Sequence, residues 1–510
     1  MLAKTKSYAL NGVEGYEVSI EVDLNAGLPA YDTVGLADTA IKESKERVRS
    51  AIKNSLLTYP IRKITINLAP ADTKKEGSHF DLAIALGILI ANEEIESDTY
   101  KDFIILGELS LDGSLNSIRG VLPLIISAIQ NGHKKFILPS KNAKEASYIS
   151  GIEVYAFDKL AEVVDFLTGK SEVKPLETSE FVAISKANKY NVDFSEVKGQ
   201  TVAKRALEIA VAGGHNVLLI GPPGAGKTMM AKCVPTIMPD MTFEEAIEVT
   251  KIHSVAGILD NSVGIVVNRP FRTPHHTATV PALMGGGANS RPGEISLAHN
   301  GVLFLDEMPE YQRRTLETLR QPLEDGVAVV SRAKRTLEYP ARFMLVASMN
   351  PCPCGNLGSK TQECKCTPSE IHRYISKLSG PLLDRIDLQI EVDSISYDDF
   401  RSSVPNESSA VIKERVEKAR AIQRTRYAGT KTKTNDEMTN AQVKSYCVLD
   451  KMGETLLKNA FTKLNLTARA STRVLKVART IADLDGSVEV LSKHVAEAIQ
   501  YRSLDRKYWD

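Results

Sequence analysis

One eight-residue run has the composition of a phosphate-binding loop. It follows the apolar stretch Val217–Ile220, precedes residues with helical spacing, and reads Gly221-Pro222-Pro223-Gly224-Ala225-Gly226-Lys227-Thr228. Glycines let backbone N–H groups curl around phosphates, and the following helix directs its positive dipole end toward them. We expect Lys227 to reach the β- and γ-phosphates and Thr228 to offer its hydroxyl to Mg²⁺. The run therefore predicts a site for ATP and magnesium.

Two carboxylates follow a second apolar strand further along the chain. Val302–Leu305 leads directly into Asp306 and Glu307. We expect Asp306 to lie on the metal shell and Glu307 to polarise the attacking water. A third predicted strand, Phe343–Ala347, leads to Asn350, which is positioned to hold the same water. Together these residues predict hydrolysis of the bound nucleotide.

Phosphoryl transfer also needs a further cation near the γ-phosphate. Arg385 follows the third strand, in a place where the site of a neighbouring subunit could receive it. Arg469 and Arg473 share one face of a predicted helix, Arg469–Ala482, and are candidates for an arginine from a helical lid. A solvated basic face is the alternative for this last pair.

Four of the six cysteines lie close together in the sequence, as Cys352, Cys354, Cys364 and Cys366. Two Cys-x-Cys pairs can converge tetrahedrally on Zn²⁺, although Cys-x₂-Cys is the more typical spacing. In a reducing compartment such a group indicates metal binding before disulfide formation. Loose thiols or a redox-labile pair remain the alternative. Bound zinc would stiffen the loop that follows Asn350.

A basic segment between the second and third strands predicts a β-hairpin over Val327–Tyr339, with Arg332, Lys334 and Arg335 near its tip. In a ring, such hairpins could line the pore, and cations there would follow a phosphate backbone without reading its sequence. The alternative is a solvated hairpin without a ligand.

A Gly/Pro-rich insertion that ends at Gly285–Gly287 carries Arg272, His275 and His276. It is either a loop that responds to nucleotide or a structural turn with incidental histidines.

The elements that must position these residues divide the chain into four segments. Residues 1–168 alternate strand and helix patterns, including strands Tyr16–Leu24 and Lys63–Leu68 and helices Asp38–Asn54 and Asp81–Ala91. Residues 169–191 are polar and predict a linker. Residues 192–393 form a second α/β region, and residues 394–510 are helical. The sequence thus predicts a multi-domain α/β protein with a C-terminal helical lid.

Bulk composition limits the function classes. The 510 residues are 43% hydrophobic and 25% charged, and 64 Lys and Arg nearly balance 63 Asp and Glu, for a net charge of +1. This excludes a globally basic nucleic-acid binder but not a local basic pore. We find no 18-residue apolar stretch and no signal-peptide pattern, so we expect a cytoplasmic protein without membrane contact.

Three further segments complete a resemblance to a known family: Phe194–Gln200, Arg269–His276 and Arg291–Gly301. With them, the chain resembles the magnesium-chelatase-like AAA+ proteins of the YifB/ComM family over essentially its whole length. The resemblance implies Lys227 and Thr228 as Walker A, Asp306 and Glu307 as Walker B, and Asn350 as sensor 1. It also implies Arg385 as a trans-acting finger in a homo-hexamer, and Arg469 as sensor 2, with Arg473 the second choice.

The resemblance also implies the substrate along which the motor moves. ComM-type members are described as hexameric helicases that drive DNA branch migration in natural transformation, so single-stranded or branched DNA is the implied partner. A protein-remodelling ATPase is the second reading. A chelatase motor subunit is a weaker third, because such subunits do not carry the front domain seen in this chain.

That front domain is similar to the C-terminal domain of Lon proteases at Asn67–Gly77 and Gly107–Gly113. The position that matches the serine nucleophile is His79, and the one that matches the lysine is Leu122. Ser78 is adjacent, but a hydroxyl without an activating base is a poor nucleophile. We expect this domain to lack protease activity and to serve in assembly or substrate handling.

Overall fold

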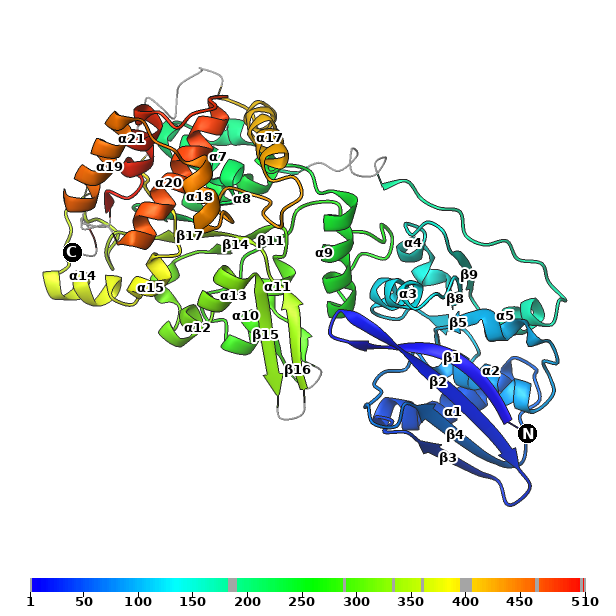
Figure 1. Cartoon of the computed structure of the whole chain (residues 1–510). Coiled ribbons are helices and arrows are strands. Elements are labelled where there is room, and N and C mark those ends of the chain that lie inside the picture. Colours follow the sequence, from blue (N-terminus) through cyan, green and yellow to red (C-terminus); the bar gives the residue numbers. More distant parts are fainter. Residues whose placement is uncertain are drawn as a thin grey trace. The chain divides into compact units, whose positions relative to one another are not determined.

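The computed structural model describes residues 2–181, 190–287, 290–332, 335–358, 362–394, 406–463, 467–504 and 508 (Figure 1). These residues fall into two compact units. The first contains the residues up to 181 together with Phe243–Val267, and the second contains residues 190–242 and those from Asn268 onward. Each unit is described by itself below.

Seven of the described strands of the first unit form a mixed sheet in the order β3-β4-β2-β1-β5-β8-β9, and β6 and β7 form a separate antiparallel pair. β2 is antiparallel to β1 and β4, and the other neighbours are parallel. The strands of this unit are β1 (Leu2–Asn11), β2 (Glu14–Asn25), β3 (Ala30–Val34), β4 (Lys63–Ala69), β5 (Phe103–Ile105), β6 (Glu108–Leu109), β7 (Leu115–Asn116), β8 (Lys135–Pro139) and β9 (Glu153–Phe157). Its helices are α1 (Thr39–Asn54), α2 (Asp81–Ala91), α3 (Val121–Gln130), α4 (Ala143–Ala146), α5 (Leu160–Leu167) and α9 (Phe243–Ala256).

Both faces of this sheet are covered, as the strand β8 illustrates. Successive side chains of a strand point to opposite faces. Ile137 packs into a core with α1, α2 and α5, whereas Phe136 and Leu138 pack into a second core with α3. Every residue of α2 is buried, which explains its nearly continuous apolar sequence. The predicted strands and helices of this region are confirmed.

An insertion from the middle of the sequence completes the first unit. The segment Phe243–Val267 follows the phosphate-binding loop in sequence, yet its helix α9 packs on α3. The Ser254 hydroxyl accepts a bond from the Gly120 N–H (3.0 Å) and donates one to the buried Glu145 carboxylate (2.5 Å). The Tyr148 hydroxyl donates to the Val263 carbonyl (2.8 Å). The continuous segment 192–393 predicted from the sequence did not anticipate this excursion, because hydrogen bonds between distant segments leave no local pattern.

Five of the described strands of the second unit form a parallel sheet in the order β11-β14-β17-β10-β18. The other four form two separate antiparallel pairs, β12–β13 and the hairpin β15–β16. The strands are β10 (Val217–Ile220), β11 (Phe271–Arg272), β12 (Gly285–Gly286), β13 (Arg291–Pro292), β14 (Val302–Leu305), β15 (Val327–Arg332), β16 (Arg335–Pro340), β17 (Met344–Met349) and β18 (Leu388–Glu391). The helices before the C-terminal region are α7 (Thr201–Gly213), α8 (Lys227–Ile237), α10 (Val280–Met284), α11 (Glu294–Leu297), α12 (Arg313–Glu317), α13 (Arg320–Asp325), α14 (Pro368–Ile375) and α15 (Gly380–Leu383).

The C-terminal helices pack directly on this α/β layer. They are α17 (Ser409–Arg426), α18 (Asn440–Tyr446), α19 (Lys451–Lys463), α20 (Ala468–Leu484) and α21 (Ser492–Gln500). Val416 of α17 and Val477 of α20 share one core with Val217 and Phe304 of the sheet. The opposite face of the sheet packs on α12, α14 and α15. The fold is the multi-domain α/β arrangement with a helical C-terminal region that the sequence predicts.

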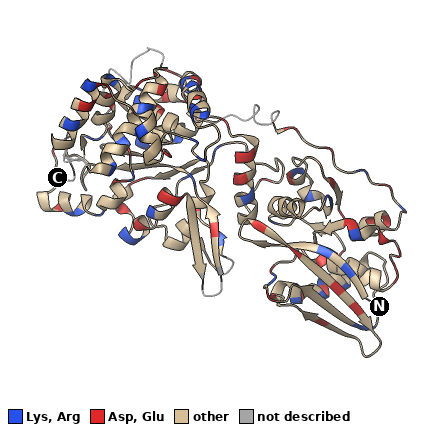
Figure 2. Cartoon of the chain, viewed as in Figure 1, with Lys and Arg blue, Asp and Glu red and all other residues tan. Residues whose placement is uncertain are grey.

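The distribution of charged residues and the apolar character of the helices agree with the composition. Lys and Arg are mixed with Asp and Glu over both units (Figure 2). Among the described residues, none of the helices combines the length and the apolar character needed to cross a membrane.

Candidate nucleotide site

The carboxyl ends of three parallel strands bring the predicted site residues together. β17 lies between β10 and β14, with Met349 paired to Ile220 and Ala347 paired to Leu305. Because all three strands run the same way, the loops that follow them meet at one edge of the sheet. The phosphate-binding loop, the two carboxylates and Asn350 follow these strands.

The glycines of the loop are needed for its shape. Gly224 and Gly226 have φ values of +78° and +86°, a region that residues with a Cβ rarely adopt. A Cβ on Gly221 would lie 2.2 Å from the Val392 carbonyl oxygen. The helix α8 begins at Lys227, directly after the loop, so its free N–H groups face the place where phosphates would bind.

Lys227 joins the loop to the end of β17. Its amine donates to the carbonyl oxygens of Gly221 (2.7 Å) and Pro222 (2.9 Å) and to the Asn350 side-chain oxygen (3.2 Å). Burial lowers the pKa of Lys227, and the nearby Asp306 and Glu307 act in the opposite direction. The amine therefore lies between the loop and Asn350, at the place where a bound γ-phosphate would contact both.

The magnesium ligands predicted from the sequence are in contact. The Thr228 hydroxyl donates to Asp306 Oδ2 at 2.9 Å. A hydroxyl and a carboxylate are ligands that Mg²⁺ accepts alongside phosphate oxygens and water. Ser348, which the sequence analysis did not select, donates to the other Asp306 oxygen, Oδ1. The strand register places Ser348 beside Asp306, and that register is not a local property of the sequence.

Glu307 is exposed and has an unusual backbone. Its φ is +51°, which costs energy for a residue with a Cβ and is typical of functional sites. Its N–H lies 3.2 Å from both Asp306 Oδ1 and the Ser348 hydroxyl, which hold this turn. The ring Nδ1 of His276 lies 3.9 Å from Glu307 Oε2. Of the two histidines in the insertion, His276 is thus the one that faces the candidate catalytic carboxylate.

The family-typical segments contact one another around the site. Arg272 of β11 makes two bonds to the Glu294 carboxylate, at 2.6 and 2.8 Å. Arg269 donates to the carbonyl oxygens of Pro239 (2.6 Å) and Asn300 (2.7 Å). These arginines therefore stabilise the scaffold and do not point toward phosphates.

The three candidate arginines have different surroundings. The guanidinium of Arg385 donates to the Pro381 carbonyl and pairs with Glu324, and its side chain is 12% exposed. Arg469 is exposed on the first turn of α20. Arg473, one turn later, pairs with the buried Asp387. This ion pair argues against Arg473 as a residue that contacts the nucleotide.

The four clustered cysteines converge. The Sγ atom of Cys352 lies 3.4 Å from that of Cys354 and 3.6 Å from that of Cys364, and Cys354 and Cys364 are 3.7 Å apart. All four ligand atoms, including that of Cys366, lie within 4.8 Å of one another. Four thiolates about 2.3 Å from a zinc ion would have similar separations. The residues therefore fit a structural zinc site.

The structure describes the two strands of the predicted basic hairpin. β15 and β16 pair from Val327↔Pro340 to Arg332↔Arg335. Lys334 lies outside the described residues, and only the backbone positions of Arg332 and Arg335 are described. Figure 1 shows the hairpin extending away from the sheet of its unit.

In the front domain, the residues at and beside the positions that match the Lon nucleophile and lysine are bonded to other groups. His79 Nε2 lies 3.0 Å from the Tyr8 carbonyl, and burial lowers its pKa to about 4, so the neutral ring donates to that oxygen. Leu122 is buried, and its N–H donates to Glu145 (3.0 Å). The Ser78 hydroxyl donates to the Glu108 carboxylate. The two matched positions therefore carry an imidazole that is bonded to the backbone and an apolar side chain, in place of a serine hydroxyl and a lysine amine.

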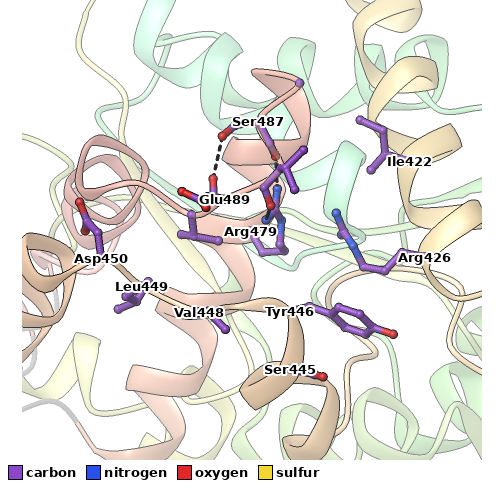
Figure 3. Close-up of a pocket in the computed structure, with 13 residues that line it drawn as sticks. Ile422, Arg426, Ser445, Tyr446, Val448, Leu449, Asp450, Arg479, Ser487 and Glu489 are labelled. Carbon is purple, nitrogen blue, oxygen red and sulfur yellow. Dashed lines mark hydrogen bonds between the residues drawn. The ribbon is translucent and has the colours of Figure 1, made fainter.

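A pocket of about 720 Å³ lies in the C-terminal helical region (Figure 3). Its two guanidinium groups, from Arg426 and Arg479, are both held by Asp483. Its lining runs from Ile422 to Val490 and includes none of the residues of the phosphate-binding loop. It is therefore separate from the nucleotide site.

The contact between Ser348 and Asp306 predicts a specific defect. Ser348→Ala removes a hydrogen bond to a charged group, worth about 1.5–3 kcal/mol, so we expect ATP turnover to fall by roughly 10- to 100-fold. ATP affinity should change much less, because Lys227 is untouched. Steady-state kinetics and binding of a fluorescent ATP analogue would measure both quantities. Ser376→Ala, whose hydroxyl donates to the Arg373 carbonyl, is the control; equal effects of the two variants would contradict the assignment.

Three family descriptions match successive parts of the chain. "Magnesium chelatase, subunit ChlI" matches residues 193–400, "Subunit ChlI of Mg-chelatase" matches residues 20–142, and "Magnesium chelatase, subunit ChlI C-terminal" matches residues 406–502.

Several relatives cover nearly the whole chain. The competence protein ComM of Haemophilus influenzae is 44% identical over 99% of this chain and 98% of its own length. YifB of Escherichia coli is 43% identical over 97% of this chain and 96% of its own length. The magnesium-chelatase 38 kDa subunit of Rhodobacter capsulatus is 24% identical over 42% of this chain and 62% of its own length. Full-length similarity at this level, together with the geometry of the phosphate-binding loop, shows that the chain belongs to the YifB/ComM family of magnesium-chelatase-like AAA+ ATPases.

Proposed function

We propose that this AAA+ ATPase assembles into a homo-hexameric ring and uses ATP hydrolysis to move DNA, as a branch-migration helicase or translocase in recombination or natural transformation. The relative ComM, called a competence protein, supports the DNA-related role. The observation that carries the motor part is the joining of Lys227, Asn350 and Asp306 at one sheet edge.

The roles of the site residues follow from charge and position. Lys227 would neutralise the β- and γ-phosphates, and Thr228 and Asp306 would hold Mg²⁺. Glu307 would orient the attacking water, with Asn350 holding it from the neighbouring strand. Such preorganised groups act mostly by positioning and by stabilising charge in the transition state.

A cation is still needed at the γ-phosphate, and we assign it to Arg385 of a neighbouring subunit. Within its own chain the guanidinium is bound to Glu324 and to a carbonyl oxygen. Delivery to a neighbour would exchange this exposed carboxylate for phosphate oxygens, and a guanidinium forms charge-assisted bonds with either group. Arg469, exposed at the start of α20, is assigned to the nucleotide of its own subunit.

The DNA part rests on the hairpin β15–β16, which carries Arg332, Lys334 and Arg335 around its turn. Six such hairpins in a ring would place cations around a central channel. Cations of this kind bind the phosphate backbone of any sequence and make binding dependent on salt.

The test is the ATPase rate with and without single-stranded or branched DNA. We expect stimulation in the wild type and its loss in the double variant Lys334→Ala/Arg335→Ala, while ATP binding is kept. The slope of log affinity against log salt should fall by about one for each phosphate contact removed. Lys451→Ala/Lys458→Ala, which removes the same charge from the exposed face of α19, is the matched control. If no DNA stimulates the wild type, the protein-remodelling alternative is favoured instead.

We also assign a structural zinc ion to Cys352, Cys354, Cys364 and Cys366. The ion would stiffen the loop that follows Asn350, where the four cysteines converge. Elemental analysis of purified protein should give about one zinc per chain. Cys354→Ser should lower both the zinc content and the unfolding temperature, whereas Cys447→Ala, at a buried cysteine outside the cluster, should retain the metal. Zinc well below one per chain in the wild type would exclude the site.

The front domain is proposed to be Lon-like without protease activity. His79 is neutral and donates to a backbone carbonyl, and Leu122 offers no amine. We therefore expect casein to remain intact with wild-type protein and ATP, at the background seen with Lys227→Ala. ATP-stimulated cleavage above that background would overturn this assignment.

A further inference from the structure

A group of buried polar residues lies at the amino ends of the strands in the second unit. His215 and Asn216 directly precede β10, and Asp387 directly precedes β18. Their exposed fractions are 0%, 6% and 2%. Because the sheet is parallel, this edge is opposite to the one that carries the phosphate-binding loop. Polar groups buried this deeply need partners, and their partners come from four separate segments.

Asn216 connects three strands and the segment of Arg385. Its side-chain amide donates to the Arg385 carbonyl (3.0 Å), and its side-chain oxygen accepts from the Leu345 N–H of β17 (2.8 Å). Its backbone N–H donates to Asp387 Oδ2 (3.0 Å), and its carbonyl accepts from the Asp387 and Leu388 N–H groups. The strand that leads to the phosphate-binding loop is thereby tied to the strand that leads to Asn350 and to the backbone of Arg385.

The lid helix α20 enters the same group through two side chains. Arg473 pairs with Asp387 Oδ1, and the Thr480 hydroxyl lies 2.8 Å from His215 Nε2. His215 Nδ1 in turn lies 3.7 Å from Asp387 Oδ2. Burial would raise the pKa of Asp387, but Arg473 and His215 more than offset it, so the pKa lies below its ordinary value and the carboxylate is ionised.

This arrangement is a charge pair and not a metal site. His215, Asp387 and Asp436 have the ligand types and spacing for a metal ion. However, the guanidinium of Arg473 already occupies the Asp387 carboxylate. A buried ion pair is a poor source of stability compared with apolar packing, and its best-attested use is to set one arrangement of elements over others.

The positions of Arg473 and Asp387 in the sequence indicate which elements this ion pair holds together. Arg473 lies one helical turn after Arg469, the lid residue assigned to the nucleotide of its own subunit. Asp387 lies just after Arg385, assigned to the nucleotide of the neighbour. Since Arg473 and Asp387 are bonded, a displacement of α20 is transmitted to the backbone that carries Arg385.

We propose that Asn216, Asp387 and Arg473 are positioning residues that couple the lid helix α20 to Arg385, so that the nucleotide held by one subunit controls the arginine offered to the next. The proposal rests on the proposed role of Arg385 in a neighbouring site.

Mixed rings separate this role from any effect on a subunit's own nucleotide. Arg385→Ala subunits keep a complete site but offer no arginine, and Glu307→Gln subunits cannot hydrolyse but still offer one. We expect each protein alone to be nearly inactive and their mixture to regain ATPase activity. Adding Arg473→Gln to the Glu307→Gln subunit should reduce the regained activity by roughly tenfold, the scale of one lost charge-assisted hydrogen bond. The subunit with the new change has no activity of its own to lose.

The outcomes are distinct. If the simple mixture regains no activity, the trans role of Arg385 fails, and the coupling fails with it. If the mixture regains activity and Arg473→Gln leaves it unchanged, the coupling is overturned while the proposed function stands. Arg424→Gln, which removes an exposed arginine of α17, is the control in the same subunit. Arg473→Lys, which keeps a cation, should restore part of the activity.

Folding and assembly need a separate check, because Arg473→Gln leaves Asp387 without its counterion. Ring size with ATP, measured by mass photometry, should match that of the parent Glu307→Gln protein. If it does not, Thr480→Val replaces Arg473→Gln. This change keeps the side-chain shape and the ion pair, and it removes the contact to His215 together with the bonds that the Thr480 hydroxyl makes to the Lys476 carbonyl and accepts from the Asn435 amide. A several-fold loss of the regained activity in complete rings supports the coupling, and unchanged activity overturns it.

Discussion

The parallel strands β10, β14 and β17 impose a strong constraint on the second unit, because they must all end at the same edge. A hydrolytic phosphate site needs backbone donors, a metal-binding carboxylate and a group that holds water within a few ångströms of one another. In this chain each of these follows a different strand, and strand pairing alone brings them together. Lys227 then closes the group by bonding to both the loop and Asn350. The same parallel pairing collects Asn216 and Asp387 at the opposite edge.

The electrostatics of the two edges differ for a physical reason. At the nucleotide edge, Asp306 is partly exposed and Glu307 is exposed, and Glu307 is held in a costly backbone conformation by Asp306 and Ser348. Such an arrangement suits groups that must exchange partners during a reaction cycle. At the other edge, the buried Asp387 is paired with Arg473, whose side chain is 22% exposed, so an exchange there would leave an uncompensated buried carboxylate. The nucleotide edge thus carries groups that can change partners, whereas the opposite edge carries groups whose contacts are costly to break.

The sequence could predict which candidate residues the fold brings together at the nucleotide edge, because their main signals are local. The loop Gly221–Thr228, the pair Asp306 and Glu307, and Asn350 each directly follow an apolar strand, and parallel strands end together. Ser348 was not predicted, since its role depends on the register between β14 and β17. The Arg473–Asp387 pair was not predicted either, because it joins a helix to a strand far away in the sequence. The sequence singled out both histidines of the insertion, but only the fold shows that His276, and not His275, faces Glu307.

The insertion Phe243–Val267 has a consequence for how the chain reaches its native state. The first unit cannot bury the carboxylate of Glu145 or the Gly120 N–H until Ser254 has been synthesised. By then the ribosome has already produced β10 and the phosphate-binding loop, whose partner strands β14 and β17 are still to come. The chain therefore completes its front unit while the motor sheet is unfinished. A fragment ending at residue 168 would lack α9 and with it the Ser254 partner of these groups, because the first unit is built from two separate segments of the sequence.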